Sequence, residues 1–418
     1  MLGCRSTKLP FVSRVQDFKK EINLELIVER VATCKVLCYE IEPKVATSSL
    51  QDRDIIEVMD YCCVLVMVIM TVFASCFRVG LSKSNEIYVK NFISWDDMKV
   101  YGHKITLNTS TVCHNQSRVI VVDKNGGGDS VTVQGAVNMV PEYNKQRVKI
   151  YILPGIYREK VVVPRFKPYI SFVGNEGQMA NTIISWHDKA SDRNSNGGSL
   201  GTYRSASVTI GSDYFCATDI TFENTVIGAP GEPGRQAVAL RIYGDKAMFY
   251  KVKIVGGQDT LLDETGSHYF YHSVIQGSVD FICGKSRSLY QECLIQSTAK
   301  KIGAIAAHHR DLPDDNTGFS FVSCIITGSG KVYLGRAWGN YSRTIYSNCY
   351  FDNVIIPAGW SDWNDPLRHK TVEFGEFQSW GTGSDTSGRV PWSKKLTYEE
   401  AKPFMDIKFI DGKQWLKL

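Results

Sequence analysis

The sequence predicts an all-β protein, a single solenoid domain folded as a parallel β-helix with short flanking helices. The main observation is an internal repeat from about residue 215: an aromatic-rich segment, a small residue, one variable residue, and Ile or Phe. The copies are short and β-branched, and they lack the longer 3.6-residue period of helices. A coil of this kind cannot bury its apolar face alone, so neighbouring coils must stack to form the core. The copies are Thr218-Asp219-Ile220, Val252-Lys253-Ile254, Ser273-Val274-Ile275, Cys293-Leu294-Ile295, Cys324-Ile325-Ile326 and Cys349-Tyr350-Phe351.

The composition supports this class. The 418 residues are 43% hydrophobic and 22% charged, an ordinary globular balance. The 35 glycines and 20 tyrosines favour a turn-rich β protein over a helical bundle. A net charge of +5 is compatible with an acidic polymer, but no block of basic residues forms the stripe that binds phosphates. We therefore expect no nucleic acid as a partner.

Ahead of the repeat, short β-rich runs predict the first coils. A helix is expected between the first two runs, at 131–143, and the tail at 385–418 should form a loop and a short helix. The runs are 119–123, 148–155, 161–164, 170–174 and 182–186.

The cysteines point to burial rather than to cross-linking. Twelve cysteines are too few for a disulfide scaffold in a chain of this length, and no CxxC pair supplies the spacing of a zinc or thioredoxin-type site. Cys293, Cys324 and Cys349 share one position of the repeat. We expect them to form a stack of small buried apolar side chains.

The N-terminal part predicts entry into the secretory route. Residues 61–77 carry no charge, and residues 59–78 resemble a signal peptide that begins at Met59. Residues 1–58 would then be an upstream extension. The alternative is a single-pass membrane anchor with a short cytoplasmic tail, because the n-region lacks a basic residue. The length of the run favours a cleaved signal peptide, since it is at the short limit for a span. Three glycosylation sequons fit this route, at Asn108, Asn115 and Asn340.

The polar stretch 79–117 is expected to be a linker, followed by the β-helix domain at 118–418.

Two aspartates occupy equivalent positions in neighbouring copies of the repeat. The segments 249–256 and 270–277 align without a gap, and Asp259 and Asp280 follow them at the same offset. Strands of one sheet lie about 4.8 Å apart, so the two carboxylates should be close on neighbouring coils. Two carboxylates that close cannot both ionise easily, and the pKa of one should rise. That arrangement supplies a proton donor beside an ionised nucleophile.

Six short motifs occur in order between residues 155 and 339. From about residue 117 to 415 they make the chain similar to the plant pectin methylesterases, or pectinesterases. The resemblance implies a right-handed parallel β-helix and a secreted carboxylic ester hydrolase that removes methyl esters from homogalacturonan in the plant cell wall. It also implies a monomer that needs no metal or other cofactor, with a proteinaceous pectinesterase inhibitor as a partner. The motifs are GIYRE (155–159), GTYRSAS (201–207), QAVALR (236–241), GGQDTL (256–261), GSVDFICG (277–284) and LGRAWG (334–339).

The resemblance implies a role for each catalytic residue. Asp280 is the nucleophile that attacks the ester carbonyl, and Asp259 is the acid that protonates the departing methanol and then the base that activates water. Gln236 and Gln258 stabilise the oxyanion with neutral donors, and Arg336 orients the nucleophilic carboxylate. These are the groups that ester cleavage requires, and a guanidinium fork suits one carboxylate.

Further residues are implied as substrate contacts. Thr202, Phe281 and Trp338 match such positions, and Gln236 and Arg336 are counted with them. Trp360 and Trp363, in the segment GWSDW, either line the sugar groove or cap the end of the solenoid.

The chain departs from the commonest family pattern at three positions. Cys283 stands where Phe is usual, Lys285 where Asn is usual, and Ala337 where many relatives have Pro. None of these changes removes a catalytic group, and Lys285 adds a charge that could alter the pH dependence.

Two other functions remain open from the sequence. One is a catalytically silent wall protein that binds pectin through the same groove, against which the intact catalytic set argues. The other is a glycosidase or lyase on a β-helix, although we find no acidic calcium cluster in the sequence. Release of methanol and the size of the product distinguish the three.

Overall fold

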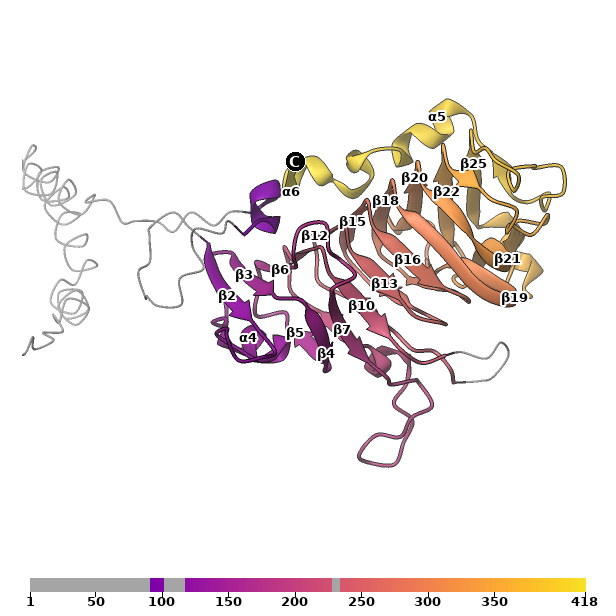
Figure 1. Cartoon of the computed structure of the whole chain (residues 1–418). Helices are drawn as coiled ribbons and strands as arrows, with labels where there is room; N and C mark the ends of the chain where they lie inside the picture. Colours follow the sequence, from indigo (N-terminus) through magenta and orange to yellow (C-terminus); the bar gives the residue numbers. More distant parts are fainter. Residues whose placement is uncertain (1–90, 101–116, 228–233) are drawn as a thin grey trace, which may run out of the picture. The chain divides into compact units, whose positions relative to one another are not determined.

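The computed structural model describes residues 91–100, 117–227 and 234–418. These residues form a parallel β-helix, which confirms the predicted fold class (Figure 1). Successive coils stack so that each strand pairs in parallel with its equivalents in the coils before and after it. The strands build two large sheets.

The first large sheet has eleven strands. In spatial order they are β2 (Arg118–Val122), β3 (Val148–Ile152), β6 (Ile170–Val173), β9 (Cys216–Thr218), β12 (Ala247–Tyr250), β15 (Ser267–Tyr271), β18 (Arg287–Gln291), β20 (Gly318–Val322), β22 (Arg343–Ser347), β25 (Glu373–Phe377) and β26 (Lys394–Lys395).

The second large sheet has fourteen strands in two halves, which the long strand β19 (Leu294–His308) joins. One half runs through β4 (Gly155–Arg158), β7 (Thr182–Trp186), β10 (Thr221–Asn224), β13 (Lys253–Val255) and β16 (Val274–Gly277). The other half runs through β17 (Ile282–Gly284), β14 (Leu261–Asp263), β11 (Leu240–Ile242), β8 (Val208–Ile210) and β5 (Val161–Val163). Beyond β19 lie the long β21 (Ile325–Ala337), β23 (Tyr350–Phe351) and β24 (Trp360–Ser361).

Short helices flank the solenoid. The helix expected at 131–143 is α4 (Val133–Met139), and its N-cap Thr132 accepts a hydrogen bond from Gly135 N. The tail forms the predicted loop and short helices. The remaining helices are the 3₁₀ helices η1 (Trp95–Met98), η3 (Thr202–Ser205), η4 (Pro366–Lys370), η5 (Lys402–Phe404) and η6 (Ile407–Ile410), with the α-helices α5 (Tyr398–Ala401) and α6 (Gly412–Trp415).

One residue in the left-handed region turns the chain from the first sheet to the second in each of seven coils. These corner residues have φ between 47° and 55°. Polar side chains such as Asp and Asn tolerate this conformation better than branched ones do. The corner residues are Asp219, Lys251, His272, Glu292, Ser323, Asn348 and Gln378.

The corners correct the first copy of the predicted repeat. Thr218 precedes the corner residue Asp219 and therefore ends β9 rather than beginning the next strand. Phe222 pairs with Ile254, so the first copy is Ile220-Thr221-Phe222, two residues later than predicted. The later copies are in the predicted register.

The interior of the solenoid contains stacked side chains of one kind. An aromatic ladder runs through five coils with ring centroids 4.5–4.9 Å apart, formed by Phe249, Phe270, Tyr290, Phe321 and Tyr346. The cysteines at the shared repeat position are buried and free, which confirms the predicted stack of apolar side chains; they are Cys293, Cys324 and Cys349.

Part of the expected linker belongs to the fold. The strand β1 (Ile93–Ser94) pairs in parallel with β27 (Leu416–Lys417), and Trp95 packs edge-on against Tyr250 at 4.8 Å. We therefore correct the linker prediction for residues 93–98. The segments 1–58 and 59–78, with the sequons at Asn108 and Asn115, lie outside the described residues. Among the described residues, no helix has the length and apolar character needed to span a bilayer.

A charged pair lies inside the solenoid. His268 Nδ1 lies 2.5 Å from Asp263 Oδ1, both side chains are fully buried, and the Tyr290 hydroxyl donates to Asp263 Oδ2 at 2.6 Å. Burial alone would raise the pKa of Asp263, but the facing His268 and the hydrogen bonds hold it below its usual range. Burial would likewise lower the pKa of His268, and Asp263 raises it instead. Each partner therefore keeps the other charged.

We predict that His268→Ala destabilises the fold by about 3–5 kcal/mol, because removal of one partner leaves the other charge buried and unpaired. Chemical denaturation at neutral pH measures the difference. His187 is a matched control, since its side chain is exposed and its backbone is outside the left-handed region. His187→Ala should change the free energy of unfolding by less than about 0.5 kcal/mol. Equal effects of the two substitutions would contradict the prediction.

Candidate active site

The two aspartates lie at equivalent positions of neighbouring coils, as predicted. β13 pairs with β16 before them and β14 pairs with β17 after them, both with the same offset between the coils. Between these strands Gln258 bridges Val279, and Asp259 N donates to Val279 O at 3.1 Å. Both aspartates have left-handed φ, 58° for Asp259 and 47° for Asp280. The shared conformation turns the chain at the junction between the two halves of the sheet.

Gly277 makes this turn possible in the second coil. A Cβ at Gly277 would lie 2.3 Å from Cβ of Phe281, which is too close for any other residue type without a shift of the chain. Phe281 is fully buried in the interior core. This corrects the expectation that Phe281 contacts substrate: it points into the solenoid and supports the turn that carries Asp280.

The two carboxyls have different surroundings. Asp280 is 4% exposed, whereas Asp259 is half-buried. Burial, and then the charge of Asp280, raises the pKa of Asp259 well above its usual range. Burial also raises the pKa of Asp280, but the hydrogen bonds and charge of Arg336 oppose that rise. The pKa of Asp259 is therefore raised further than that of Asp280, and a proton shared by the pair favours Asp259.

Arg336 binds Asp280 through two parallel hydrogen bonds. Its Nε donates to Asp280 Oδ1 at 2.7 Å, and its Nη2 donates to Asp280 Oδ2. The strand register explains how residues 56 positions apart meet: Cys283 on β17 pairs with Ala307 on β19, and Ala307 pairs with Arg336 on β21. A bidentate pair of this kind fixes both the position and the charge of the carboxylate.

The two predicted oxyanion donors lie on the same side of the coils as the aspartates. Gln236, in the coil before Gln258, forms a backbone β-bridge with it. Gln258 forms the same kind of bridge with Val279 in the next coil. The backbone of Ala237 donates to Gln258 O at 3.0 Å, which fixes this spacing. Both side chains belong to half-buried residues. A hydrogen bond from Gln258 also reaches Asp259, where it opposes the rise in pKa.

The predicted sugar contacts flank this group. Trp338 is half-buried and meets His309 edge-on at 4.6 Å. Thr202 begins η3, and Ser205 of the same turn accepts from Val238 N at 3.1 Å, which ties the turn to the coil of Gln236.

The two tryptophans of the segment GWSDW lie on opposite faces of the sheet. Trp360 is 1% exposed and stacks on Phe374 at 4.5 Å in the interior, so it cannot line a groove. The Trp363 ring lies over the Arg336 guanidinium, with 4.0 Å between the ring centroid and Cζ. Trp363 therefore lies beside the predicted catalytic residue Arg336.

The unusual residues of the sequence also lie here. Cys283 is 3% exposed and belongs to an apolar cluster against which Trp338 and Trp363 pack. Lys285 lies 3.7 Å from Asp311, so its charge has a partner. Neither Asp311 nor Arg368, whose Nη1 donates to the carbonyls of Ala337 and Trp338, was found by sequence reasoning, because no motif or spacing marks them.

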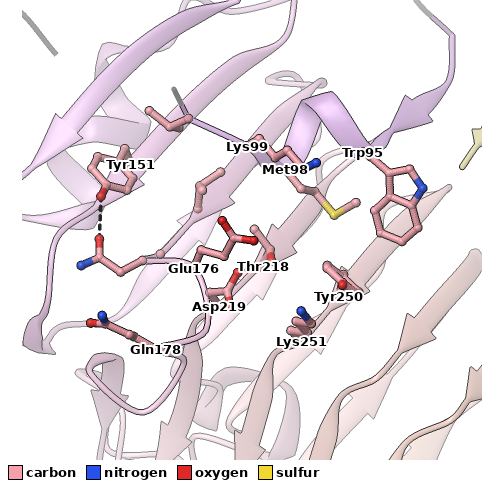
Figure 2. Close-up of a pocket in the computed structure, with 14 residues that line it drawn as sticks. Trp95, Met98, Lys99, Tyr151, Glu176, Gln178, Thr218, Asp219, Tyr250 and Lys251 are labelled. Carbon is pink, nitrogen blue, oxygen red and sulfur yellow. Dashed lines mark hydrogen bonds between the residues drawn. The ribbon is translucent and has the colours of Figure 1, made fainter. Parts of the chain in front are cut away.

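A separate cavity of about 390 Å³ lies at the corner between the two large sheets (Figure 2). Its lining includes Trp95, Tyr151, Glu176, Asp219 and Lys251. None of the predicted catalytic residues is among its lining, so this cavity is not the site of the aspartate pair. Among the described residues, no group of three or more His, Cys, Asp or Glu side chains is arranged to hold a metal ion.

Comparisons with known proteins identify the family of the chain. The model of the pectinesterase family matches residues 119–413. Pectinesterase QRT1 from Arabidopsis thaliana is 58% identical over 366 residues, which cover 84% of this chain and 96% of that protein. The solved pectin methylesterase from carrot is 36% identical with a TM-score of 0.65, over 74% of this chain and 96% of its own. A pectin methylesterase from Aspergillus niger is 26% identical with a TM-score of 0.61, over 74% and 97%.

The chain belongs to the pectinesterase family. It is an enzyme of that family, a carboxylic ester hydrolase, and its β-helix is the fold of the family's solved structures. The geometry of this pectinesterase adds what the comparisons do not give: which carboxyl is paired with Arg336, which has the more strongly raised pKa, and which tryptophan lies over that arginine.

The difference between the two carboxyls gives a spectroscopic prediction. Infrared spectra of this pectinesterase should retain a carboxylic-acid band above about pH 5, where ordinary aspartates have ionised. Asp259→Asn should abolish that band. Asp280→Asn should move its titration to lower pH, because the neighbouring negative charge that raises the pKa of Asp259 is removed. A band that survives Asp259→Asn would assign the protonated carboxyl to another residue.

Proposed function

We propose that this pectinesterase hydrolyses the methyl esters of homogalacturonan to pectate and methanol, with Asp280 as nucleophile and Asp259 as acid and then base. The observation that carries the proposal is the asymmetry of the pair. Arg336 binds both oxygens of Asp280, while Asp259 on the neighbouring coil has its pKa raised well above the usual range. Two similar residues thereby take opposite protonation states.

The reaction follows from these states. The Asp280 carboxylate attacks the ester carbonyl, and the amide groups of Gln236 and Gln258 donate hydrogen bonds to the oxyanion that forms. Asp259 gives its proton to the departing methoxide, which leaves as methanol, and Asp280 keeps the acyl group. Asp259, now ionised, takes a proton from water while the water oxygen attacks the acyl carbon. Free Asp280 and the galacturonate carboxyl result.

The surroundings of the pair suit a polysaccharide. Trp338 offers an apolar ring for a sugar face, and Thr202 offers a hydroxyl, as the family resemblance implies. We propose that the enzyme acts as a secreted monomer on cell-wall pectin and that a proteinaceous inhibitor regulates it. Asn340 of the third sequon is exposed, as a glycosylation site requires. N-terminal sequencing and glycosidase treatment of the secreted protein test the route and distinguish a cleaved signal from a membrane anchor.

We predict that Asp280→Asn lowers methanol release from methylated pectin by about 10³-fold or more while the fold is retained. An amide has nearly the shape of the carboxylate but is a poor nucleophile. Asp314→Asn, at an exposed position, is the matched control and should keep full activity. A protein that binds pectin silently would release no methanol even as wild type, and a glycosidase or lyase would shorten the polymer.

We also predict that Arg336→Lys lowers kcat/KM strongly, because an ammonium cannot reproduce the planar fork. Arg336 holds the pKa of Asp280 down, so weakening the contact lets that pKa rise. The ionised nucleophile then forms only at higher pH, and the acidic limb of the pH profile of kcat/KM moves upward. If the limb stays in place, Arg336 contacts the sugar without setting the ionisation of Asp280.

A further inference from the structure

The guanidinium of Arg336 is held on its face as well as on its edge. The edge that carries Nε and Nη2 binds Asp280, and the ring of Trp363 covers the guanidinium at 4.0 Å from Cζ. An arginine side chain has many rotamers, and a bidentate pair forms only in a narrow range of orientations. A tryptophan ring stacked on the guanidinium restricts the orientation of the guanidinium plane. Tryptophan is also the best aromatic partner for a cation.

The backbone of Trp363 is in an uncommon conformation. Trp363 has φ of 63° and the following Asn364 has φ of 60°, both in the left-handed region. A bulky aromatic residue rarely adopts this conformation, because Cβ meets the neighbouring carbonyl. Such residues persist where the surroundings fix them, and they concentrate at functional sites. Here the turn directs the indole ring back over the strand of Arg336.

The loop that carries Trp363 is tied to the catalytic strand. It begins at β24, whose Ser361 pairs with Arg336 itself. At its far end, Arg368 donates from Nη1 to the carbonyl oxygens of Ala337 and Trp338, immediately after Arg336. Between these anchors, Asp362 binds His369 Nε2 at 2.8 Å, and the His369 ring stacks on Trp392 at 4.8 Å.

We propose that Trp363 is a positioning residue: it holds Arg336 in the orientation that grips both oxygens of Asp280, and thereby keeps the nucleophile ionised. The inference rests on the proposed function of Asp280. Trp363 acts through Arg336, so its role differs from that of an aromatic residue that only contacts the sugar. The neighbouring Trp338 packs on the same apolar cluster but meets His309 and not Arg336.

The sign of the effect follows from the charges around Asp280. The titratable groups that influence it are Asp259 on the preceding coil, Arg336 on β21 and the Cys283 thiol on β17, with Tyr333 beside Arg336. Arg336 is the only cation in this set. Loss of the ring loosens Arg336, so the pKa of Asp280 rises and ionisation requires a higher pH.

The test compares pH profiles of kcat and kcat/KM for four proteins on methylated pectin: the wild type, Trp363→Ala, Trp363→Phe and Trp338→Ala. Trp363→Ala should move the acidic limb upward by about 0.5–1 pH unit and lower kcat by roughly tenfold. Trp363→Phe keeps a ring over Arg336 and should restore most of the wild-type limb. Trp338→Ala should raise KM and leave the limb in place.

The outcomes separate the inference from the function on which it rests. If Trp363→Ala raises KM as Trp338→Ala does and its acidic limb coincides with that of the wild type, Trp363 is a sugar contact and the inference is wrong. Thermal unfolding of Trp363→Ala at the assay temperature shows whether the fold is intact. If that variant unfolds, Trp363→Leu decides, because it removes the ring but keeps apolar bulk: an acidic limb shifted upward relative to that of Trp338→Ala supports the inference, and an unshifted limb with raised KM overturns it. Activity retained in Asp280→Asn would instead overturn the proposed function itself.

Discussion

The hydrogen-bonded register between successive coils is the constraint on which the rest of this structure depends. In seven coils a left-handed corner turns the chain between the two sheets, so the next strand begins at a fixed point above the one below. A slip by one residue would exchange the inner and outer faces of a strand. It would turn the carboxylates toward the interior of the solenoid and the aromatic ladder outward. The core and the site are therefore specified by the same ladder of backbone contacts.

The same register lets distant segments form one compact site. Asp259, Asp280 and Arg336 come from β-helix coils that are separated by many residues in sequence, yet each lies a few strand spacings from the next. No loop closure is needed to assemble them, because the strands already stand side by side. The rigidity of a packed sheet also suits the bidentate pair of Asp280 and Arg336, which forms only in a narrow range of orientations.

Sequence reasoning identified the residues that repeat along the chain or match a motif. The aspartate pair was predictable because two copies of the repeat align without a gap, and the cysteine stack because three cysteines share one position. The first copy was misplaced because Thr218 resembles the small residue that follows a corner, and only the φ of Asp219 shows where the corner lies. Phe281 was assigned to the substrate from the family resemblance, and the sequence does not show which way its side chain points after the left-handed residue Asp280. Arg368 carries no pattern at all: its contacts are to backbone carbonyls, which any sequence supplies.

The buried cysteines have a consequence for how this protein is made. Five free thiols lie inside the described part of the chain, and burial raises the pKa of Cys283 and Cys293 well above the ordinary value. Once enclosed, the thiols of Cys283 and Cys293 form almost no thiolate and exchange very slowly. While the solenoid is incomplete, they are open to oxidation and to wrong pairing. In an oxidising compartment, closure of the coils competes with disulfide formation. The yield of active enzyme therefore depends on the speed of folding as well as on final stability.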